Sequence, residues 1–399
     1  MMVAARDPWP ARRGDQLRTL QFARALAAEW RVTLLAPGTG RSARAAESLP
    51  PGVSVVRYRR TVGDRLLGLV RAAFAGEPLQ AGLFASRDLR RRLSAETEAC
   101  ALVLVQLVRS RHALRALAGG SLLSRAPVVV DFIDCLSLAF EKRAELDAFW
   151  RRSVLREEAR LLARAERETL ELAAAAAVVC ARDREAMRMR AGAENAAKLS
   201  VLPLSVEPGG PTARREPGAR PVLALTGNLG YFVNRDAVLF FLDAVWPALR
   251  RTRPELRLVV AGARPGRLEA RVRHAGAELV ADPADLRSVL ASATVALAPL
   301  RCGAGVPVKI LEAWQVGTPV VASPWAAAGT IAAPERELLV ANEVLDWQRQ
   351  IARLLDDRGL RERLAAAGRA AIEREHSPDG AATAIREWAR GVVSRARGR

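Results

Sequence analysis

Two successive series of short apolar runs, each run followed by a helical pattern, constrain the fold of this 399-residue chain most strongly. The runs are continuous rather than alternating, as is typical of parallel strands that are buried on both faces of a sheet. The first series has a short run within 1–6 and longer runs at 31–37, 53–59, 102–107, 127–134 and 174–181. The second has runs at 221–229, 256–262, 295–300 and 318–323. The pattern predicts two α/β domains, each built on a parallel sheet.

Helical periodicity fills most of the segments between these runs. We expect helices at 16–29, 140–172, 235–251, 286–293, 307–316, 343–356, 359–375 and 378–392. The segment 64–93 is also largely helical, and its apolar residues stand among Arg65 and Arg71: Leu66, Leu67, Leu69, Val70 and Phe74. A position on a membrane surface is open for this segment, but the pattern favours packing against the core.

The segment 208–220 is rich in proline, glycine and arginine and has no apolar period. Such a composition is typical of a linker between domains. We therefore expect an N-terminal domain at 1–207, a C-terminal domain at 221–377 and a final helix at 378–399.

The formal charge of +19, from 62 basic and 43 acidic residues, would attract phosphates, nucleic acid or anionic lipid. An arginine-rich composition without a role in binding explains this charge as well. The basic residues are dispersed and no finger, knuckle or aromatic stacking motif accompanies them, so the sequence disfavours a nucleic-acid partner. An anionic inner-membrane surface stays open as a partner.

The four cysteines form no C-x-x-C pair, so neither a zinc site nor a disulfide framework is expected. The N-terminus lacks the apolar core of a signal peptide, and no apolar run approaches the ~20 residues that span a bilayer. We expect a cytoplasmic protein without a bound metal, whose contact with the inner face of the plasma membrane is at most peripheral.

In open parallel sheets, ligands bind beyond the carboxyl ends of the strands. The first unusual strand end has Gly227, Asn228 and Gly230, where glycines allow close approach of the backbone and the next helix can point its N-terminus at a phosphate. An ordinary tight turn between strand and helix would explain the same residues.

The second strand end opens a helix with Lys309 and Glu312, which are three residues apart and therefore share one helix face. Backbone amides and Lys309 suit a diphosphate, while Glu312 can accept hydrogen bonds from ribose hydroxyls. An ordinary surface Lys/Glu pair is the alternative. The loop before this helix contributes Arg301, Gly303, Ala304 and Gly305 as further candidates for donor binding.

The third strand end lies in the first domain, where Gly14, Asp15 and Arg18 stand at a helix start and could contact an acceptor. Asp15 could instead be the N-cap of that helix.

The segment GAGVPVKILEAWQVGTPVVAS, preceded by VALAPL and followed by ELLVANEVLDW, resembles the donor-binding signature of GT-B glycosyltransferases of the family 4 type. TGNLGYFVNRDAVLFFLDAVWPAL, PWPARRGDQLRTLQFARALA and KLSVLPLSVE are similar to landmarks of a bacterial branch associated with exopolysaccharide synthesis. The likeness covers both halves of the chain in the same order.

This resemblance implies an α/β fold of the GT-B class, with two facing Rossmann-like domains on parallel sheets and a C-terminal helix crossing back to the first domain. It implies a nucleotide-diphosphate sugar in the C-terminal domain and a glycan or lipid-linked acceptor mainly on the N-terminal domain. It also implies transfer with retention of the anomeric configuration, with no cofactor or metal required.

The resemblance also implies residue roles in the C-terminal domain. Glu312 matches the second of the family's paired glutamates, which holds the ribose, and Gly305 lies where the backbone approaches the sugar or phosphate. Gly227 and Gly230 match the strand-end glycine turn. The first glutamate of the pair is replaced by Ala304, while Asn228 and Val233 stand where an arginine and a lysine are usual. Lys309 is therefore our candidate for stabilising the leaving diphosphate.

In the N-terminal domain, Gly14 matches the glycine of the family's first loop. Ile133 replaces a usual histidine, and the neighbouring Asp134 is our candidate for orienting the acceptor hydroxyl. Asp134 could instead be a strand-end cap. Because of these replacements, a catalytically silent scaffold and a sugar epimerase of the same fold stay open as alternatives.

Overall fold

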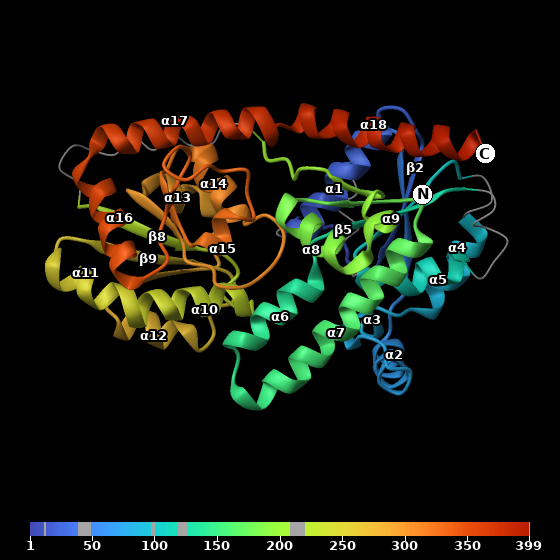
Figure 1. Cartoon of the computed structure of the whole chain (residues 1–399), viewed down its shortest axis with the longest axis horizontal. Helices are drawn as coiled ribbons and strands as arrows, with labels where there is room; N and C mark the ends of the chain where they lie inside the picture. The colour runs from blue at the N-terminus through green and yellow to red at the C-terminus, as the bar shows by residue number, and fades with distance from the viewer. Residues whose placement is uncertain (12, 39–48, 97–99, 119–125, 208–219, 399) are drawn as a thin grey trace. The chain divides into compact units, whose positions relative to one another are not determined.

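The computed structural model describes residues 1–11, 13–38, 49–96, 100–118, 126–207 and 220–398 (Figure 1). The predicted linker, apart from its last residue, lies outside these ranges. Contacts between residues divide the chain into two compact units. The first contains Met1–Leu204 together with Asp379–Arg399, and the second contains Ser205–Pro378.

The first unit is built on a parallel sheet with the strand order β3-β2-β1-β4-β5-β6-β7. Its strands are β1 Met2–Val3, β2 Val32–Pro37, β3 Val53–Tyr58, β4 Val103–Gln106, β5 Val128–Ile133, β6 Ala175–Val178 and β7 Leu199–Val201. Neighbouring residues of one strand, such as Leu104 and Val105, belong to separate apolar clusters. The sheet is therefore buried on both faces, as the continuous apolar runs predicted.

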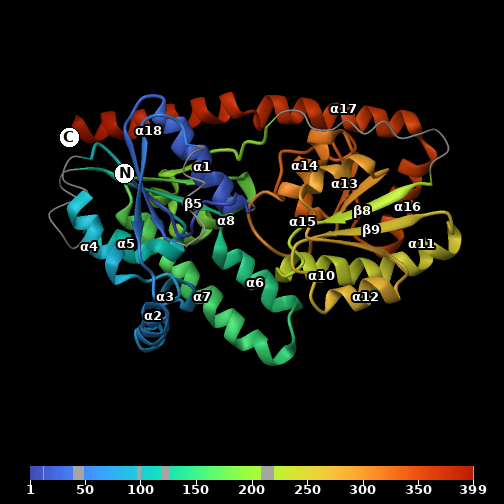
Figure 2. The ribbon, with the colours of Figure 1, turned by 180° about the vertical axis from the view of Figure 1, so that it is seen from behind.

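Helices cover both faces of this sheet (Figure 2). They are α1 Gly14–Ala27, α2 Val62–Phe74, α3 Leu79–Gly82, α4 Arg87–Glu96, α5 Arg111–Ala118, α6 Leu136–Leu146, α7 Phe149–Leu172, α8 Ala181–Ala191 and α9 Ala193–Ala196, with a 3-10 turn, η2, at Val108–Ser110.

The single helix predicted at 140–172 is wrong, because the chain turns between α6 and α7. Asp147 and Ala148 both have non-helical backbone conformations. The Asp147 carboxylate accepts hydrogen bonds from the Ala148 amide at 2.9 Å and from Arg143 at 3.0 Å. These local bonds compete with continuation of the helix.

Helix α2 presents an apolar stripe to solvent, which corrects the expectation that its apolar side chains pack into the core. The stripe consists of Val62, Leu66, Val70 and Phe74, which are 70%, 60%, 52% and 91% exposed. Their spacing of four places them on one helix face. The opposite face, with Gly68 and Ala72 buried, is the one that packs on the protein.

The second unit has a parallel sheet with the order β10-β9-β8-β11-β12-β13. Its strands are β8 Val222–Thr226, β9 Arg257–Gly262, β10 Glu278–Ala281, β11 Val295–Ala298, β12 Val320–Ala322 and β13 Leu339–Val340. Its helices are α10 Phe232–Phe240, α11 Trp246–Thr252, α12 Leu268–His274, α13 Leu286–Ser292, α14 Val308–Val316, α15 Pro324–Ala327, α16 Val344–Asp356 and α17 Arg358–Glu375.

The helix predicted at 235–251 is present but contains a π-helical turn, η3, at Phe241–Val245 between α10 and α11. Pro247 is the second residue of α11, which begins directly after this turn. Proline lacks an amide hydrogen and its ring crowds the preceding turn, so a wider turn lets the helix continue past it.

The last helix, α18 (Pro378–Arg397), packs almost entirely within the first unit. The ring of Trp388 meets Phe22 of α1 edge to face, with centroids 6.3 Å apart. Arg390 and Arg386 pair with Glu29, just beyond the end of α1. The predicted return of the C-terminal helix to the first sheet is therefore observed.

Candidate functional site

The second sheet reverses its strand order between β8 and β11. The chain leaves β8 toward β9 on one side and leaves β11 toward β12 on the other. At such a switch point the loops beyond the two strands diverge and leave a crevice where ligands bind. Both glycine loops predicted from the sequence follow these two strands, so the structure brings them to one place.

The loop after β8 depends on close backbone packing that glycine alone allows. Gly227 has a φ of +140°, and a Cβ there would lie 2.8 Å from Nδ2 of Asn234. A Cβ on Gly262, at the end of β9, would lie only 1.7 Å from the carbonyl oxygen of Gly227. The glycines therefore allow the loop to lie directly against the neighbouring strand.

Asn234, which the sequence analysis did not single out, joins the two loops. Its Nδ2 donates to the backbone oxygen of Asn228 at 3.0 Å, and its Oδ1 accepts from Nζ of Lys309 at 2.9 Å. The Asn228 side chain in turn accepts from the amide of Gly230 at 3.1 Å. The sequence has no local signal for this role, because α10 also contains Arg235 and Asp236 and the contact with Lys309 depends on the fold.

The loop after β11 is fixed by contacts with its surroundings. Gly303 and Gly305 have φ values of +105° and +73°, a region that favours glycine. Nε1 of Trp325 donates to the Gly303 carbonyl at 3.0 Å, and a Cβ on Gly303 would lie 3.2 Å from the Val233 side chain. Val233, where the resemblance expects a cation, thus packs against this loop.

Arg301 is engaged within the protein. Its guanidinium forms two hydrogen bonds to the Asp236 carboxylate, at 3.0 and 2.6 Å, and lies over the ring of Phe240. Ala304, in the same loop, is half-buried and offers no polar side chain.

Helix α14 begins with Pro307 as its N-cap, and no side chain caps its first amides. Lys309, in the first turn of the helix, and Glu312, in the second, are both half-buried. Burial lowers the pKa of Lys309 to about 8, although nearby Glu312 opposes this shift. Burial raises the pKa of Glu312 to about 7, against the effect of Lys309. Each group is therefore close enough to sense the other's charge.

The Glu312 carboxylate makes no hydrogen bond or ion pair with any residue that the structure describes. Arg287, in the first turn of α13, pairs with Asp285 at 2.8 Å. Its pKa is raised, mainly by the hydrogen bond to Asp285 and in part by Glu312. The start of α13 therefore lies near Glu312, which the sequence analysis missed.

In the first unit, Gly14 and Asp15 open α1. The N-cap is Arg13, so the alternative reading of Asp15 as the N-cap is wrong. The Asp15 carboxylate instead lies 2.7 Å from Nε of Arg6. The two side chains therefore pair beyond the end of β1.

Arg18 is completely enclosed within the first unit. Its side chain pairs with Asp131 of β5 at 3.0 Å, and both side chains are 0% exposed. It also donates to the backbone oxygen of Pro203 at 2.9 Å and lies over the ring of Phe22. These contacts hold α1 on the sheet and leave the Arg18 side chain no direct contact with solvent.

Asp134 follows Ile133, whose φ of +65° is unusual for a β-branched residue. Oδ1 of Asp134 is buried and has no hydrogen-bond partner among the described residues. Burial raises the pKa of Asp134 to about 7; Arg109 opposes this shift, and carboxylates that include Asp15 add to it. A carboxyl group whose pKa lies near 7 and whose oxygen has no hydrogen-bond partner can exchange a proton with a bound hydroxyl.

Over the described part of the chain, the structure brings together no three side chains of His, Cys, Asp or Glu in a way that could hold a metal ion.

Residues 220–357 match the family model described as "Glycosyl transferases group 1". No curated protein matches the chain. Among solved structures, the chain resembles sucrose-phosphate synthase from Thermosynechococcus elongatus, with a TM-score of 0.73, 17% identity and 98% of each chain covered. It resembles Anabaena HepE in complex with UDP and glucose, with a TM-score of 0.66, 14% identity, and 97% of this chain and 98% of that chain covered. A Rickettsia africae glycosyltransferase gives a TM-score of 0.64 at 10% identity, with 98% and 97% covered. At these identities the structural likeness shows a shared fold.

Proposed function

We propose that this chain, whose residues 220–357 match the glycosyl transferases group 1 model and which has the GT-B fold, transfers a sugar from a nucleotide-diphosphate sugar to a glycan or lipid-linked acceptor. We place the donor in the C-terminal domain, 221–377, and the acceptor on the N-terminal domain, 1–207. The proposal includes retention of the anomeric configuration and a role in exopolysaccharide synthesis, both of which the resemblance implies.

The uncapped start of α14, with Lys309 and the unpartnered Glu312 one turn inside it, is the observation that carries this proposal. A helix N-terminus and a cation suit a diphosphate, and a carboxylate without a protein partner suits a pair of ribose hydroxyls. The loops of Gly227 and Gly303 let the backbone come close to the nucleotide. Arg301 contributes through Asp236 to the shape of the loop.

The chemical step breaks the bond between the anomeric carbon and a diphosphate oxygen. Negative charge develops on the diphosphate and positive charge on the sugar. Lys309, the amides near Gly303 and Gly305, and the dipole of α14 stabilise the leaving group. Since Ala304 places no carboxylate beside the sugar, leaving-group stabilisation carries more of the rate here. Asp134 orients the acceptor hydroxyl and accepts its proton.

Replacing Glu312 with glutamine tests the donor site, because the amide keeps the shape of the side chain and removes its charge. The Anabaena relative was solved with UDP and glucose, so UDP is the first nucleotide to titrate, followed by GDP. We expect binding by calorimetry to weaken about 10- to 150-fold, since a hydrogen bond to a charged group contributes roughly 1.5–3 kcal/mol.

The matched control is Glu362→Gln, which alters an exposed glutamate of α17 paired with Arg358. Its affinity should equal that of the native protein. Equal affinity for Glu312→Gln would remove Glu312 from the ribose site, and a native protein that binds neither nucleotide would refute the donor proposal.

We further propose that the protein works in the cytoplasm, in contact with an anionic membrane surface. No helix among the described residues is long and apolar enough to cross a bilayer. The apolar stripe of α2 is flanked by exposed Arg65 and Arg71. At the start of α7, Phe149 and Trp150 are 81% and 63% exposed and are followed by exposed arginines. Apolar side chains among arginines are typical of helices that lie in a membrane interface.

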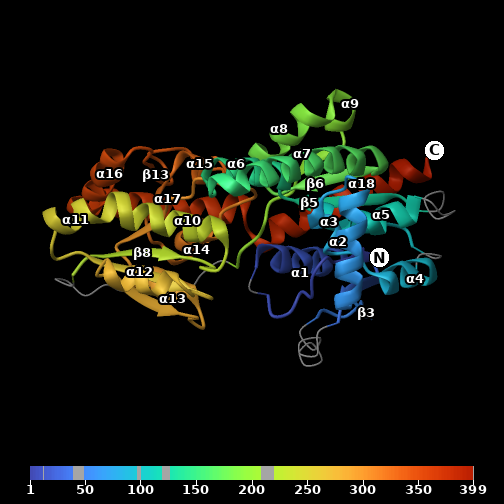
Figure 3. The same cartoon turned by 90° about the horizontal axis from the view of Figure 1, so that it is seen from below.

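Both surfaces lie at one edge of the first unit, the lower edge in Figures 1 and 2. Figure 3 looks at this edge and shows α2 in full view. Replacing Leu66 and Val70 with aspartate should reduce flotation with phosphatidylglycerol vesicles roughly tenfold or more, because burying one such side chain contributes about 1.5–3 kcal/mol. The control Met189→Asp changes an apolar side chain of α8 that is 76% exposed and should float like the native protein. If the variant with aspartate at Leu66 and Val70 floats as well as Met189→Asp, the proposed contact of α2 with the membrane is refuted.

A further inference from the structure

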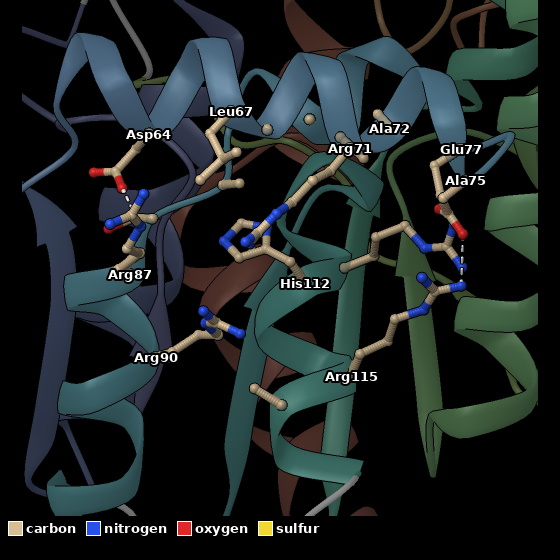
Figure 4. Close-up of a pocket in the computed structure, with 17 residues that line it drawn as sticks. Asp64, Leu67, Arg71, Ala72, Ala75, Glu77, Arg87, Arg90, His112 and Arg115 are labelled. Carbon is tan, nitrogen blue, oxygen red and sulfur yellow. Dashed lines mark hydrogen bonds and ion pairs between the residues drawn. The ribbon is translucent and has the colours of Figure 1, made fainter.

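A cavity of about 440 Å³ lies under α2 in the first unit (Figure 4). Helices α2, α3, α4 and α5 supply most of its lining. This volume falls within the range of roughly 300–1,000 Å³ that is typical of sites for small ligands. None of the residues to which we assign a role in sugar transfer lines it.

Close backbone contact between α2 and α3 forms one side of this cavity. Helix α2 meets α3 at Gly68 and Gly82, where a Cβ on Gly68 would lie 2.1 Å from the Gly82 carbonyl oxygen, and a Cβ on Gly82 would lie 2.5 Å from that of Gly68. This close contact fixes one side of α2. The walls beyond it are mostly small or apolar, with Leu67, Ala72 and Ala116 among them. Such walls suit an apolar portion of a ligand.

The ionic side chains around the cavity carry an excess of positive charge. Asp64 and Glu77 line it, and both are already paired: Asp64 lies 3.7 Å from Arg87, and Glu77 lies 2.9 Å from Arg115 and in contact with Arg111. Two further arginines, Arg71 and Arg90, also line it. Among the described residues, Arg71 has no hydrogen-bond or ion-pair partner.

His112 stands at the centre of this arrangement. Figure 4 shows Arg71 reaching toward it from α2 and Arg90 pointing toward the same space from α4. Both ring nitrogens of His112 are enclosed, and neither is in hydrogen-bonding geometry with a described residue. Burial lowers the pKa of His112 to about 4; an interaction with the backbone of Arg109 opposes this shift, and the charges of Arg60 and Arg90 add to it. The ring is therefore neutral at pH 7 and keeps one N–H for donation.

We propose that this cavity binds an amphiphilic phosphate, with its anionic group between Arg71, Arg90 and the ring of His112 and its apolar part against the small-residue walls. This assignment rests on the proposed function: the phosphate would be the group that joins the lipid to the glycan in a lipid-linked acceptor. A lipid is favoured over a free phosphate because the helix that roofs the cavity carries the apolar stripe on its outer face. A lipid in a bilayer that contacts the apolar stripe on the outer face of α2 would lie beside the cavity under its inner face.

Three soluble probes distinguish the contribution of the phosphate charge from that of the alkyl chain: octyl phosphate, octyl glucoside and inorganic phosphate. The octyl compounds are kept below the concentration at which they form micelles. Calorimetry on the native protein should give at least tenfold tighter binding for octyl phosphate than for either other probe. In the double variant Arg71→Gln/Arg90→Gln, and separately in His112→Phe, binding of octyl phosphate should weaken at least tenfold and threefold, respectively. The exposed arginine variant Arg188→Gln is the control and should bind like the native protein.

Each other outcome overturns a stated part of the proposal. Equal binding of octyl glucoside and octyl phosphate would exclude a phosphate site, and equal binding of inorganic phosphate would exclude the lipid. Unchanged affinity in the double variant would exclude this cavity. Circular dichroism and thermal denaturation show whether the first unit of each variant is folded. UDP titrations of the same proteins report on the donor site in the second unit, so unchanged UDP binding shows that a negative result concerns the cavity and not the proposed donor.

Discussion

Replacing Lys309 with alanine is expected to lower turnover about 100- to 1,000-fold at saturating donor. The Lys309 ammonium is half-buried, is fixed by Asn234 at 2.9 Å and lies in the first turn of α14. A hydrogen-bond donor that is already positioned against the charge of the transition state typically accelerates a reaction by a factor of this size. It does so because the site needs no reorganisation during the reaction. Initial rates with excess donor isolate the chemical step from donor binding.

Lys142→Ala is the matched control, since Lys142 is a lysine of the first unit that pairs with Glu145 on the surface of α6. Its turnover should be that of the native protein. If Lys309→Ala raises KM for the donor but leaves kcat unchanged, Lys309 contributes only ground-state binding and the assignment to the leaving group is wrong.

Replacing Arg18 with methionine should destabilise the first unit by about 3–5 kcal/mol. The substitution leaves the Asp131 carboxylate buried with only Gln106 nearby, at 3.5 Å, and breaking a buried ion pair on one side leaves an uncompensated charge. The backbone oxygen of Pro203 also loses its bond from Arg18. Chemical denaturation, followed by a signal specific to the first unit, measures this change.

Arg390→Met provides the comparison, because its pair with Glu29 also joins α18 to the end of α1 but is exposed. Exposed pairs contribute about 0–1 kcal/mol. The double variant Arg18→Met/Asp131→Leu should recover much of the lost stability, since it removes both charges. If Arg18→Met costs no more than Arg390→Met, the buried pair does not hold α1 on the sheet.

The sequence predicted the strands best where they are continuous apolar runs. The run at 127–134 became β5, buried along its whole length. The short strands β10 and β13 were not assigned, because β10 lies at a sheet edge with exposed ends and β13 has two residues. The turn between α6 and α7 was also missed, because Asp147 has no glycine or proline beside it and the turn depends on hydrogen bonds made by the Asp147 side chain.

For the candidate site, the sequence placed Gly227 and Gly303 in the loops, and Lys309 at the helix start, that the fold brings to one switch point. It could not predict Asn234, because the hydrogen bond from Lys309 to Asn234 joins residues 75 positions apart. Nor could it predict Arg287, which lies near Glu312 only through the packing of α13 on α14. The roles of these residues in donor binding stay predictions for the experiments above.

The membership of α18 in the first unit has a consequence for how the protein is made. The first unit needs residues from both ends of the chain, whereas Ser205–Pro378 is continuous. During synthesis on the ribosome, Phe22 of α1 cannot contact Trp388 until the second unit has been synthesised. The later half of the chain can thus complete its folding first, and a protease cut within 1–204 or the loss of the last twenty residues would damage the same structural body.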